Sequence, residues 1–425
     1  MLLEFRLGNF RSFKDESAIS LIASADKSLR DNTVETGISS LPRAVRSAVV
    51  YGPNASGKSN FLRGLLLMRG MVVESASLPP QSTFNIQPFR LDPETKDRPC
   101  LFEVTVSIDG VRYQYGFEAT PNRIMAEWLL VYQTNKSAIW FDRRRDETTD
   151  KDIYKLGSGL KGSKQVWRDA TRPNALFLST AIQLNSEVLA PLYNWFAESL
   201  HVIQPGQMIP DTFTTEKIKD PIWERRVIDF LSSADIAISA IRAHEMDGFH
   251  SLLRINPAEG VVSESRIEKG RVLRPRFTHS VGETTAEMEF EDESDGTQKL
   301  FALAGPLFEI LQRGQVLIID ELDRSLHELL VRHFVRLFHD PEINTKGAQL
   351  IFTSHDSSLL EGNLLRRDQV WFVEKGNDLA SYLTPLTEYS ARKDEALDRG
   401  YRAGRYGAIP VLPHRLRVET ELGSQ

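Results

Sequence analysis

The sequence predicts an α/β protein with a mixed and parallel sheet between flanking helices, an antiparallel β-subdomain and a helical insertion. Three observations predict this fold. Apolar runs at 48–51, 316–319 and 349–352 each end in a glycine loop or in polar residues, as buried parallel strands do. Two alternating runs flank Asp109-Gly110, which is typical of an antiparallel hairpin. Residues 165–245 carry helical patterns instead.

The remaining elements follow from the same periodicities. Residues 1–13 alternate between apolar and polar side chains and should form a strand that pairs with a second one. The runs at 101–108 and 111–117 form the predicted hairpin, and 127–140 offers further strands. Later in the chain we expect helices at 190–196 and 223–243, strands within 250–292, a helix from 295 to 308, parallel strands at 316–319 and 349–352 joined by a helix at 326–338, and a strand at 369–373.

Length and composition predict a large globular protein. The chain has 425 residues, of which 41% are hydrophobic and 26% charged. We expect an N-terminal lobe at 1–160, a helical insertion at 161–249, a C-terminal lobe at 250–413 and a disordered tail at 414–425. A single cysteine, Cys100, excludes an internal disulfide and fits a reducing cytosol. Because no apolar run approaches the roughly 20 residues of a membrane span, we expect a cytoplasmic protein without a membrane partner.

A phosphate-binding loop is the strongest motif in the chain. Residues 52–59 fit the pattern G-x-x-x-x-G-K-[ST], with an apolar run before them and a helical pattern after them. In such a loop the backbone N–H groups and the helix N-terminus face phosphate oxygens. Lys58 would reach the β- and γ-phosphates of ATP, and the Ser59 hydroxyl would bind Mg²⁺. The nucleotide-binding residues are therefore predicted to be Gly52, Pro53, Asn54, Ala55, Ser56, Gly57, Lys58, Ser59 and Asn60.

Two acidic residues, Asp320 and Glu321, directly follow the apolar run at 316–319. A carboxylate at the end of a buried strand needs a partner, because burying a bare charge is costly. Mg²⁺ held by Ser59 would be that partner for Asp320, and Glu321 would then polarise the attacking water. We expect this strand to lie next to the strand that precedes the phosphate loop, which would bring the two motifs together.

Two further segments have both a structural and a functional interpretation. Ser294, Asp295 and Gly296 stand at a predicted helix start, where an ordinary N-cap is the simpler explanation and an anion site is the alternative. His355 follows the last central strand. A lone histidine is usually structural, but this position favours a side chain that senses the γ-phosphate and holds the attacking water.

Together these motifs resemble those of ABC-type ATPases. Residues 52–59 resemble the Walker A motif, 316–321 Walker B with its catalytic glutamate, and His355 the switch histidine. Ser294-Asp295-Gly296 resembles the signature motif, although Glu293 and Asp295 depart from its usual Leu and Gly. Leu322-Asp323 resembles the D-loop. The resemblance implies an ABC-type ATPase head in which Lys58, Glu321 and His355 are catalytic.

Other segments resemble particular branches of this superfamily. Residues 9–13 are similar to the N-terminal strand of the RecF/SMC branch, in which the basic residue, here Arg11, helps to hold the nucleotide. Gln87, before Pro88-Phe89, is the candidate Q-loop glutamine. Residues 366–374 and 401–410 resemble the stand-alone AAA/ABC ATPases of bacterial defence operons, the RloA-like and PARIS AriA-like proteins.

The resemblance implies a homodimer, or a higher even oligomer, with shared ATP sites. It also implies an anti-phage sensor that responds to a phage-derived trigger and controls a separate effector such as a Toprim-type nuclease. The alternative is a RecF-like DNA-repair ATPase that binds DNA, against which the net charge of −6 counts. The basic runs at 143–145 and 271–276 could contact nucleic-acid phosphates, but we expect them to be a solvated surface.

Overall fold

The computed structural model of the protein describes residues 1–134, 136–256, 261–324, 326–389 and 396–409. The tail expected at 414–425 lies outside the described residues. Within the described part of the chain, none of the helices combines the length and the apolar character needed to cross a membrane.

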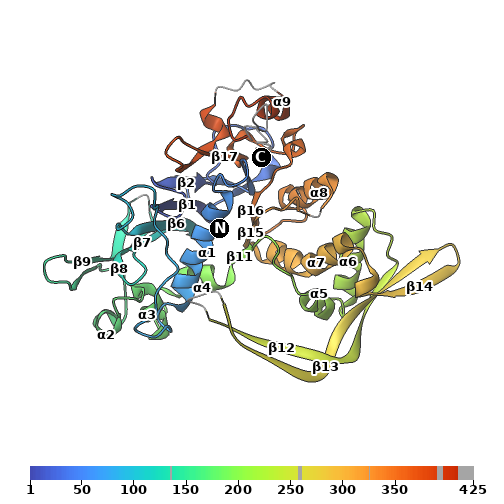
Figure 1. Ribbon diagram of the computed structural model, residues 1–425, viewed down its shortest axis with the longest axis horizontal. Coiled ribbons are helices and arrows are strands. Elements are labelled where there is room, and N and C mark those ends of the chain that lie inside the picture. Colours follow the sequence, from blue (N-terminus) through green and yellow to red (C-terminus); the bar gives the residue numbers. More distant parts are fainter. Residues whose placement is uncertain (135, 257–260, 325, 390–395, 410–425) are drawn as a thin grey trace, which may run out of the picture.

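A six-stranded mixed sheet forms the centre of the molecule (Figure 1). Five of its strands are parallel, and the last pairs antiparallel with its neighbour. This is the mixed and parallel sheet that the apolar runs predict. In spatial order the strands are β11 (Leu200–Ile203), β15 (Val316–Ile319), β16 (Gln349–Thr353), β5 (Ser47–Tyr51), β17 (Val370–Lys375) and β18 (Ser381–Pro385).

Both faces of this sheet are covered, which explains why its strands are apolar throughout. Along β15, Val316 and Ile318 join one hydrophobic core, while Leu317 and Ile319 join another. Such alternation is expected because successive side chains of a strand point to opposite faces. The first core includes residues of α1 (Lys58–Glu74), α3 (Phe177–Gln183) and α4 (Ala190–Glu198). The second includes residues of α6 (Pro221–Ser233), α7 (Asp295–Arg313) and α8 (Glu328–His339).

An antiparallel sheet of seven strands packs against the other side of α1. The predicted hairpin is confirmed as β6 and β7, and both turn residues, Asp109 and Gly110, have positive φ (50° and 74°), as a tight two-residue turn requires. The strands, in spatial order, are β10 (Asp152–Leu156), β9 (Ala138–Arg145), β8 (Ile124–Tyr132), β7 (Val111–Ala119), β6 (Cys100–Ile108), β1 (Leu2–Gly8) and β2 (Ser17–Ser20).

Aromatic packing fixes α1 against the first strand and the turn that follows it. The ring of Phe61 lies 5.2 Å from that of Phe5 and 5.6 Å from that of Phe13, centroid to centroid. A Cβ atom at Gly64 would come within 2.6 Å of the Leu7 side chain, so a glycine is needed where the helix approaches β1. The helix that begins at the phosphate loop is therefore held on its far side by the N-terminal strand.

Segment 161–249, predicted to be a helical insertion, is distributed over several parts of the molecule. Its helices α3 and α4 share a core with α1, and β11 pairs in parallel with β15 as the edge strand of the central sheet. The other helices of this segment are α2 (Lys164–Ala170), α5 (Thr212–Lys217) and α6, of which α5 and α6 contact α7. A small hairpin is formed by β3 (Thr33–Glu35) and β4 (Arg43–Val45).

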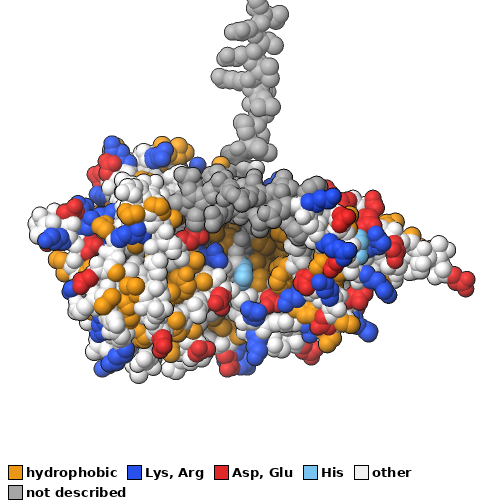
Figure 2. All heavy atoms as spheres, turned by 90° about the horizontal axis from the view of Figure 1, so that it is seen from below, with side chains coloured by type: hydrophobic (Ala, Val, Ile, Leu, Met, Phe, Trp, Pro, Cys, Tyr) orange, Lys and Arg blue, Asp and Glu red, His pale blue; other side chains and the backbone are white. Residues whose placement is uncertain are grey.

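A long ribbon starts next to α6; its β12–β13 part runs along the lower side of the view and its β14 end projects at the right (Figure 1). It consists of β12 (Ala240–Asn256), β13 (Val261–Val281) and β14 (Thr284–Glu289), paired antiparallel. The chain then enters α7, and its last described helix is α9 (Leu397–Arg402). Figure 2 shows acidic and basic side chains intermixed over the face seen from below, without a large region of one sign.

The expectation that Arg143 belongs to a solvated surface is wrong. Its side chain is 1% exposed, and its guanidinium lies 2.7 Å from Asp152 and 3.6 Å from Glu127. Glu127 in turn accepts hydrogen bonds from the N–H groups of Phe177 and Leu178 at the start of α3. Burial raises the pKa of Glu127, and Arg143 opposes that rise. This ion pair ties α3 to the antiparallel sheet.

Candidate nucleotide-binding site

The phosphate loop lies between β5 and α1, as predicted. No side chain caps α1, whose N-cap is Gly57, so the first N–H groups of the helix are not satisfied by a capping side chain. Gly57 has φ 120°, and a Cβ atom there would lie 2.9 Å from Ser12 Oγ and even closer to Ser381 Oγ. Only glycine fits this position, and the uncapped start of α1 leaves backbone N–H groups that can bind an anion.

Lys58 extends along the loop with its ammonium group toward the acidic residues. Its Nζ donates to the carbonyls of Gly52 (2.6 Å) and Pro53 (3.1 Å). Burial lowers the pKa of Lys58, while the nearby carboxylates of Asp320 and Glu321 act to raise it. The ammonium group can thus exchange two carbonyl partners for phosphate oxygens without leaving its place.

Two serines far apart in sequence support the loop from outside. The hydroxyl of Ser381 donates to the carbonyl of Ser56, and the N–H of Ser381 donates to the carbonyl of Ser12 (2.7 Å). The side-chain amide of Asn60 donates to Ser12 Oγ (3.0 Å). The Ser381 hydroxyl thus satisfies the Ser56 carbonyl of the loop. Nothing in the motif itself points to either serine.

The expected adjacency of the two motif strands is wrong. β16 lies between β5 and β15, paired in parallel with both. The chain leaves β15, passes through α8 and returns to insert β16 beside the phosphate-loop strand. Neighbouring strands are about 4.8 Å apart, so the acidic pair is about 10 Å from the line of β5. The end of β16 therefore separates the two motifs and contributes residues of its own.

Thr353, the last residue of β16, connects its strand to the acidic pair. Its Oγ1 donates to Asp320 Oδ1 (2.6 Å) and accepts a hydrogen bond from the N–H of Glu321 (2.7 Å). Its backbone carbonyl accepts the N–H of Leu322 (3.1 Å). Glu321 has φ 56°, in the left-handed region that non-glycine residues enter at a cost. No motif in the sequence points to Thr353.

The residues predicted to bind Mg²⁺ fit that role. Asp320 is 7% exposed, and among the described residues its Oδ2 atom and the Ser59 hydroxyl have no hydrogen-bond partner. No group of three or more His, Cys, Asp or Glu side chains in the described part of the chain could hold a metal by itself. Mg²⁺ in nucleotide sites needs only one or two protein ligands, because phosphates and water complete its shell.

His355 lies just beyond Thr353, at the same edge of the sheet. Its N–H donates to Asp323 Oδ2 (3.0 Å), and its side chain is exposed. Partial burial, and then the Lys58 ammonium, lower the pKa of His355, while Asp323 and Glu321 oppose this. The imidazole is therefore uncharged at neutral pH.

Arg11 and Gln87 lie together on the other side of the loop. The N–H of Arg11 donates to the carbonyl of Gln87 (2.7 Å), and both residues line a pocket of about 320 Å³ with Asn60 and Lys375. Arg11 Nε is buried without a hydrogen-bond partner. Burial, followed by the charge of Arg63, lowers the pKa of Arg11. This cationic pocket, next to the first turn of α1, can accept negatively charged oxygens.

Ser294 and Gly296 lie at the exposed start of α7. The Ser294 hydroxyl accepts the N–H of Thr297 (3.2 Å) and lies 2.8 Å from the Thr297 hydroxyl, so Ser294 is an N-cap. Within the described residues of one chain, no hydrogen bond joins Ser294 to the phosphate loop. The fold of one chain leaves this helix start facing solvent.

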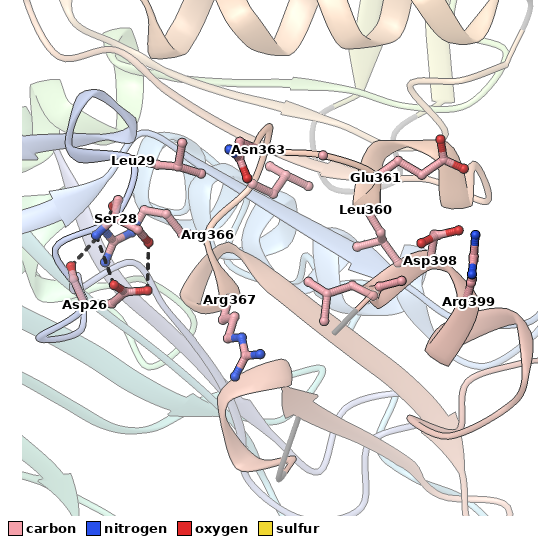
Figure 3. A pocket seen from close by; sticks show the side chains of 14 residues that line it. Asp26, Ser28, Leu29, Leu360, Glu361, Asn363, Arg366, Arg367, Asp398 and Arg399 are labelled. Carbon is pink, nitrogen blue, oxygen red and sulfur yellow. Dashed lines mark hydrogen bonds between the residues drawn. The ribbon is translucent and has the colours of Figure 1, made fainter. Parts of the chain in front are cut away.

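A cavity of about 810 Å³ (Figure 3) is lined by residues that all lie outside the phosphate loop. Arg366 is at its edge, but the guanidinium is already bonded to both oxygens of Asp368 (2.9 and 2.7 Å) and to the carbonyls of Asp26 and Ser28. Within segment 366–374, which carries the family resemblance, this arginine therefore has a structural role.

The C-terminal segment packs beneath the phosphate-loop strand. The rings of Tyr401 and Tyr406 both stack on Phe372, with centroids 5.7 and 5.6 Å away and planes 18° apart. Tyr401 also lies 5.2 Å from Tyr51, the last residue of β5. Tyr401 and Tyr406, from segment 401–410, thus help to position β5, the strand that leads into the loop.

The solved structures that are similar to this chain include SMC head domains. The SMC head domain from Thermotoga maritima has 15% identity and a TM-score of 0.40, covering 90% of this chain and 98% of that one. The SmcHead bound to the C-winged helix domain of ScpA has 14% identity and a TM-score of 0.43, with coverages of 91% and 99%. The Smc head domain with an extended coiled coil, bound to the C-terminal domain of ScpA from Pyrococcus furiosus, has 12% identity and a TM-score of 0.39. The match covers 91% of this chain and 97% of that one.

A comparison with curated proteins finds no match. Residues 47–361, however, match the protein family described as "AAA domain, putative AbiEii toxin, Type IV TA system". The matched stretch is 315 residues long (361 − 47 + 1) out of 425. It begins with β5 and extends past His355, so it contains the phosphate loop, the acidic pair and His355. The chain therefore belongs to this family of AAA-domain proteins.

Proposed function

We propose that this protein is an ATP-binding and ATP-hydrolysing switch that acts as an ABC-type dimer and controls a separate effector. One observation carries the proposal. The ends of three adjacent parallel strands gather the phosphate loop, Thr353 to His355, and the acidic pair at one edge of the central sheet. Such an edge is where α/β proteins bind nucleotides.

Each side chain has a defined role in this proposal. The backbone of 52–59 holds the phosphates, and Lys58 neutralises the β- and γ-phosphate oxygens. Ser59 and Asp320 would hold Mg²⁺, which neutralises charge on the transferred phosphoryl group when it is bound. Glu321 orients and deprotonates the attacking water. His355, uncharged at neutral pH, hydrogen-bonds near the γ-phosphate.

The exposed start of α7 supports the dimer. In one chain, Ser294 and Gly296 lie at an uncovered helix N-terminus, whose N–H groups and dipole favour an anion. Two chains arranged head to tail would place this helix start against the γ-phosphate held by the other chain. A two-fold arrangement needs only one pair of complementary surfaces for both sites.

The effector and the defence role rest on weaker support. The family description names a toxin and a type IV toxin–antitoxin system, and the C-terminal motifs resemble those of defence ATPases. An ATP-driven change between two dimer states would hold or release the effector. The DNA-binding alternative is weakened, because Arg143 is buried in an ion pair and cannot contact nucleic-acid phosphates.

Subunit mixing tests the shared site. Lys58→Ala and Ser294→Arg should each be inactive as pure dimers. After subunit exchange about half of the dimers are mixed, and each has one doubly damaged and one intact site. Activity should therefore return to about a quarter of the wild-type value if the sites act independently. A mixture that stays inactive although exchange is demonstrated would contradict independent shared sites.

A second variant at Ser294 separates the cap from the shared site. Aspartate is as good an N-cap as serine, so Ser294→Asp should keep the stability of α7. Its negative charge would repel the γ-phosphate of the partner's nucleotide, and ATP hydrolysis should fall. Normal hydrolysis by both Ser294→Asp and Ser294→Arg would mean that Ser294 is only a helix cap.

A further inference from the structure

We infer that Thr353 is a positioning residue, which holds the metal-binding carboxylate of Asp320 and the base Glu321 in fixed relation for hydrolysis. The inference rests on the proposed ATPase function and goes beyond it. Thr353 would not touch ATP; it would act through its two acidic neighbours. Its side chain is the only hydroxyl in the described residues that hydrogen-bonds to both members of the acidic pair.

One hydroxyl group makes both contacts. Thr353 Oγ1 donates its proton to Asp320 Oδ1 at 2.6 Å and accepts the N–H of Glu321 at 2.7 Å. A hydroxyl has one donor and two acceptor positions, so these bonds are compatible. Thr353 is fully buried, which makes both bonds strong and leaves no water to replace them.

The bond to Asp320 orients a metal ligand. With Oδ1 engaged by Thr353, the carboxylate plane is fixed and Oδ2 is left for Mg²⁺. Hydrogen bonds of this kind to a metal-binding carboxylate commonly change metal affinity or activity by about 10- to 100-fold.

The bond to Glu321 stabilises an unusual backbone. Glu321 has φ 56°, and a residue other than glycine remains there only when its surroundings hold it. The Thr353 hydroxyl holds its N–H, and the Thr353 carbonyl holds the N–H of Leu322 at 3.1 Å. Without the hydroxyl, Glu321 would be free to leave this conformation, and its carboxylate would leave the position of the attacking water.

Thr353→Val isolates the hydroxyl, because valine has nearly the same shape and keeps the backbone bond to Leu322. Thr353→Ser restores the hydroxyl and should behave within about threefold of wild type. Thr215→Val is the matched control, since Thr215 is equally buried and donates to the carbonyl of Asp211 (2.8 Å), on a helix outside the phosphate-loop edge.

The main readout is metal binding without turnover. Binding of Mn²⁺ in the presence of a non-hydrolysable ATP analogue, followed by electron paramagnetic resonance, should weaken about 10- to 100-fold in Thr353→Val. Affinity for the analogue without metal should stay within about twofold, because the phosphate loop is intact. The rate of hydrolysis should fall at least as much as metal affinity, and Thr215→Val should match wild type in both assays.

The outcomes separate this inference from the proposed function. If wild type binds metal and nucleotide and hydrolyses ATP, but Thr353→Val does so equally well, Thr353 has no positioning role. If wild type neither binds the metal–nucleotide complex nor hydrolyses ATP, the proposed function itself is wrong. Should Thr353→Val not fold, Thr353→Cys replaces it: the thiol is a weak hydrogen-bonding group, so a cysteine variant as active as the serine variant would overturn the inference.

Discussion

The hydroxyl of Tyr51 donates a hydrogen bond of 3.0 Å to the backbone carbonyl of Asp356. Tyr51 is the last residue before the phosphate loop, and Asp356 directly follows His355. This bond therefore connects the strand that leads into the loop with the segment that carries His355. Tyr401 packs on the same ring from the C-terminal segment.

Tyr51→Phe should uncouple these two segments while leaving the aromatic packing in place. The loss of one hydrogen bond to a partly buried carbonyl should lower the free energy of unfolding by about 1 kcal/mol. We expect ATP binding to be nearly unchanged and hydrolysis to fall several-fold, because the bond holds the backbone next to His355 and makes no contact with the loop residues 52–59. Urea denaturation and steady-state kinetics measure the two effects; a raised KM with unchanged kcat would show that the bond serves the phosphate loop instead.

Glu321→Gln and Lys58→Ala should fail in different ways. The glutamine variant keeps Lys58, which neutralises the phosphates, so it should still bind ATP. Because it lacks the base, it should hydrolyse ATP about a hundredfold more slowly, or worse. The alanine variant lacks the cation that meets the β- and γ-phosphates, so it should lose nucleotide binding. Equilibrium binding of a fluorescent ATP analogue, measured beside turnover, distinguishes them. Unchanged turnover in Glu321→Gln would exclude Glu321 as the base.

The contribution of the buried ion pair to stability can be tested with Arg143 and, as its control, the exposed neighbour Arg144. Arg143→Ala leaves the fully buried carboxylate of Glu127 without its cation, whereas Asp152 keeps its ion pair with Arg123 (3.0 Å), and the change should cost about 3–5 kcal/mol of stability. Arg144 has a side chain that is 63% exposed, and its pair with Asp142 lies at the surface, so Arg144→Ala should be nearly neutral. Equal effects in urea denaturation would show that the pair contributes no more than a surface contact.

Buried His339 should make stability depend on pH. Burial, reinforced by Arg46, lowers the pKa of His339 to about 3. Its value in the unfolded chain is about 6.5, so between these values the unfolded state binds the extra proton. The contribution of His339 to the free energy of unfolding is therefore fully present above pH 6.5 and is lost as the pH falls. Between pH 7 and pH 5 this contribution should fall by about 2 kcal/mol.

His339→Gln removes the titrating group and keeps a side chain that can bond to Ser47, which lies 2.8 Å from the imidazole. The stability of this variant should fall less steeply than that of wild type when urea denaturation is compared at pH 7 and pH 5. Other groups titrate in both proteins and cancel in the comparison. Parallel pH profiles would mean that His339 does not contribute.

The sequence predicts the principal motif residues because each follows an apolar run that can only be a buried strand. The ends of parallel strands meet at one edge, which brings Lys58, Asp320 and His355 together without further information. The order of the strands in the sheet cannot be predicted in this way. Nothing local in α8 indicates that β16 will insert between β5 and β15, since this depends on how whole layers pack.

The supporting residues escape prediction for a related reason. Thr353, Ser12 and Ser381 act through single hydrogen bonds to segments distant in sequence, and isolated hydroxyl residues are common everywhere. Arg143 did carry a signal: it lies two residues after Phe141, on the same face of β9, and Phe141 is fully buried. Its charge and its neighbours in the run concealed that pattern.

The composite origin of the central sheet has a consequence for protein synthesis. β5 and the phosphate loop are complete near residue 59, but the adjacent strands β16 and β17, and the Ser381 hydroxyl, come from the last fifth of the chain. At ribosomal speeds of about 5–20 residues per second, the roughly 320 residues in between take about 15–65 s to emerge. During that interval the nascent chain carries a complete phosphate-loop sequence without the strands that flank β5 in the folded sheet.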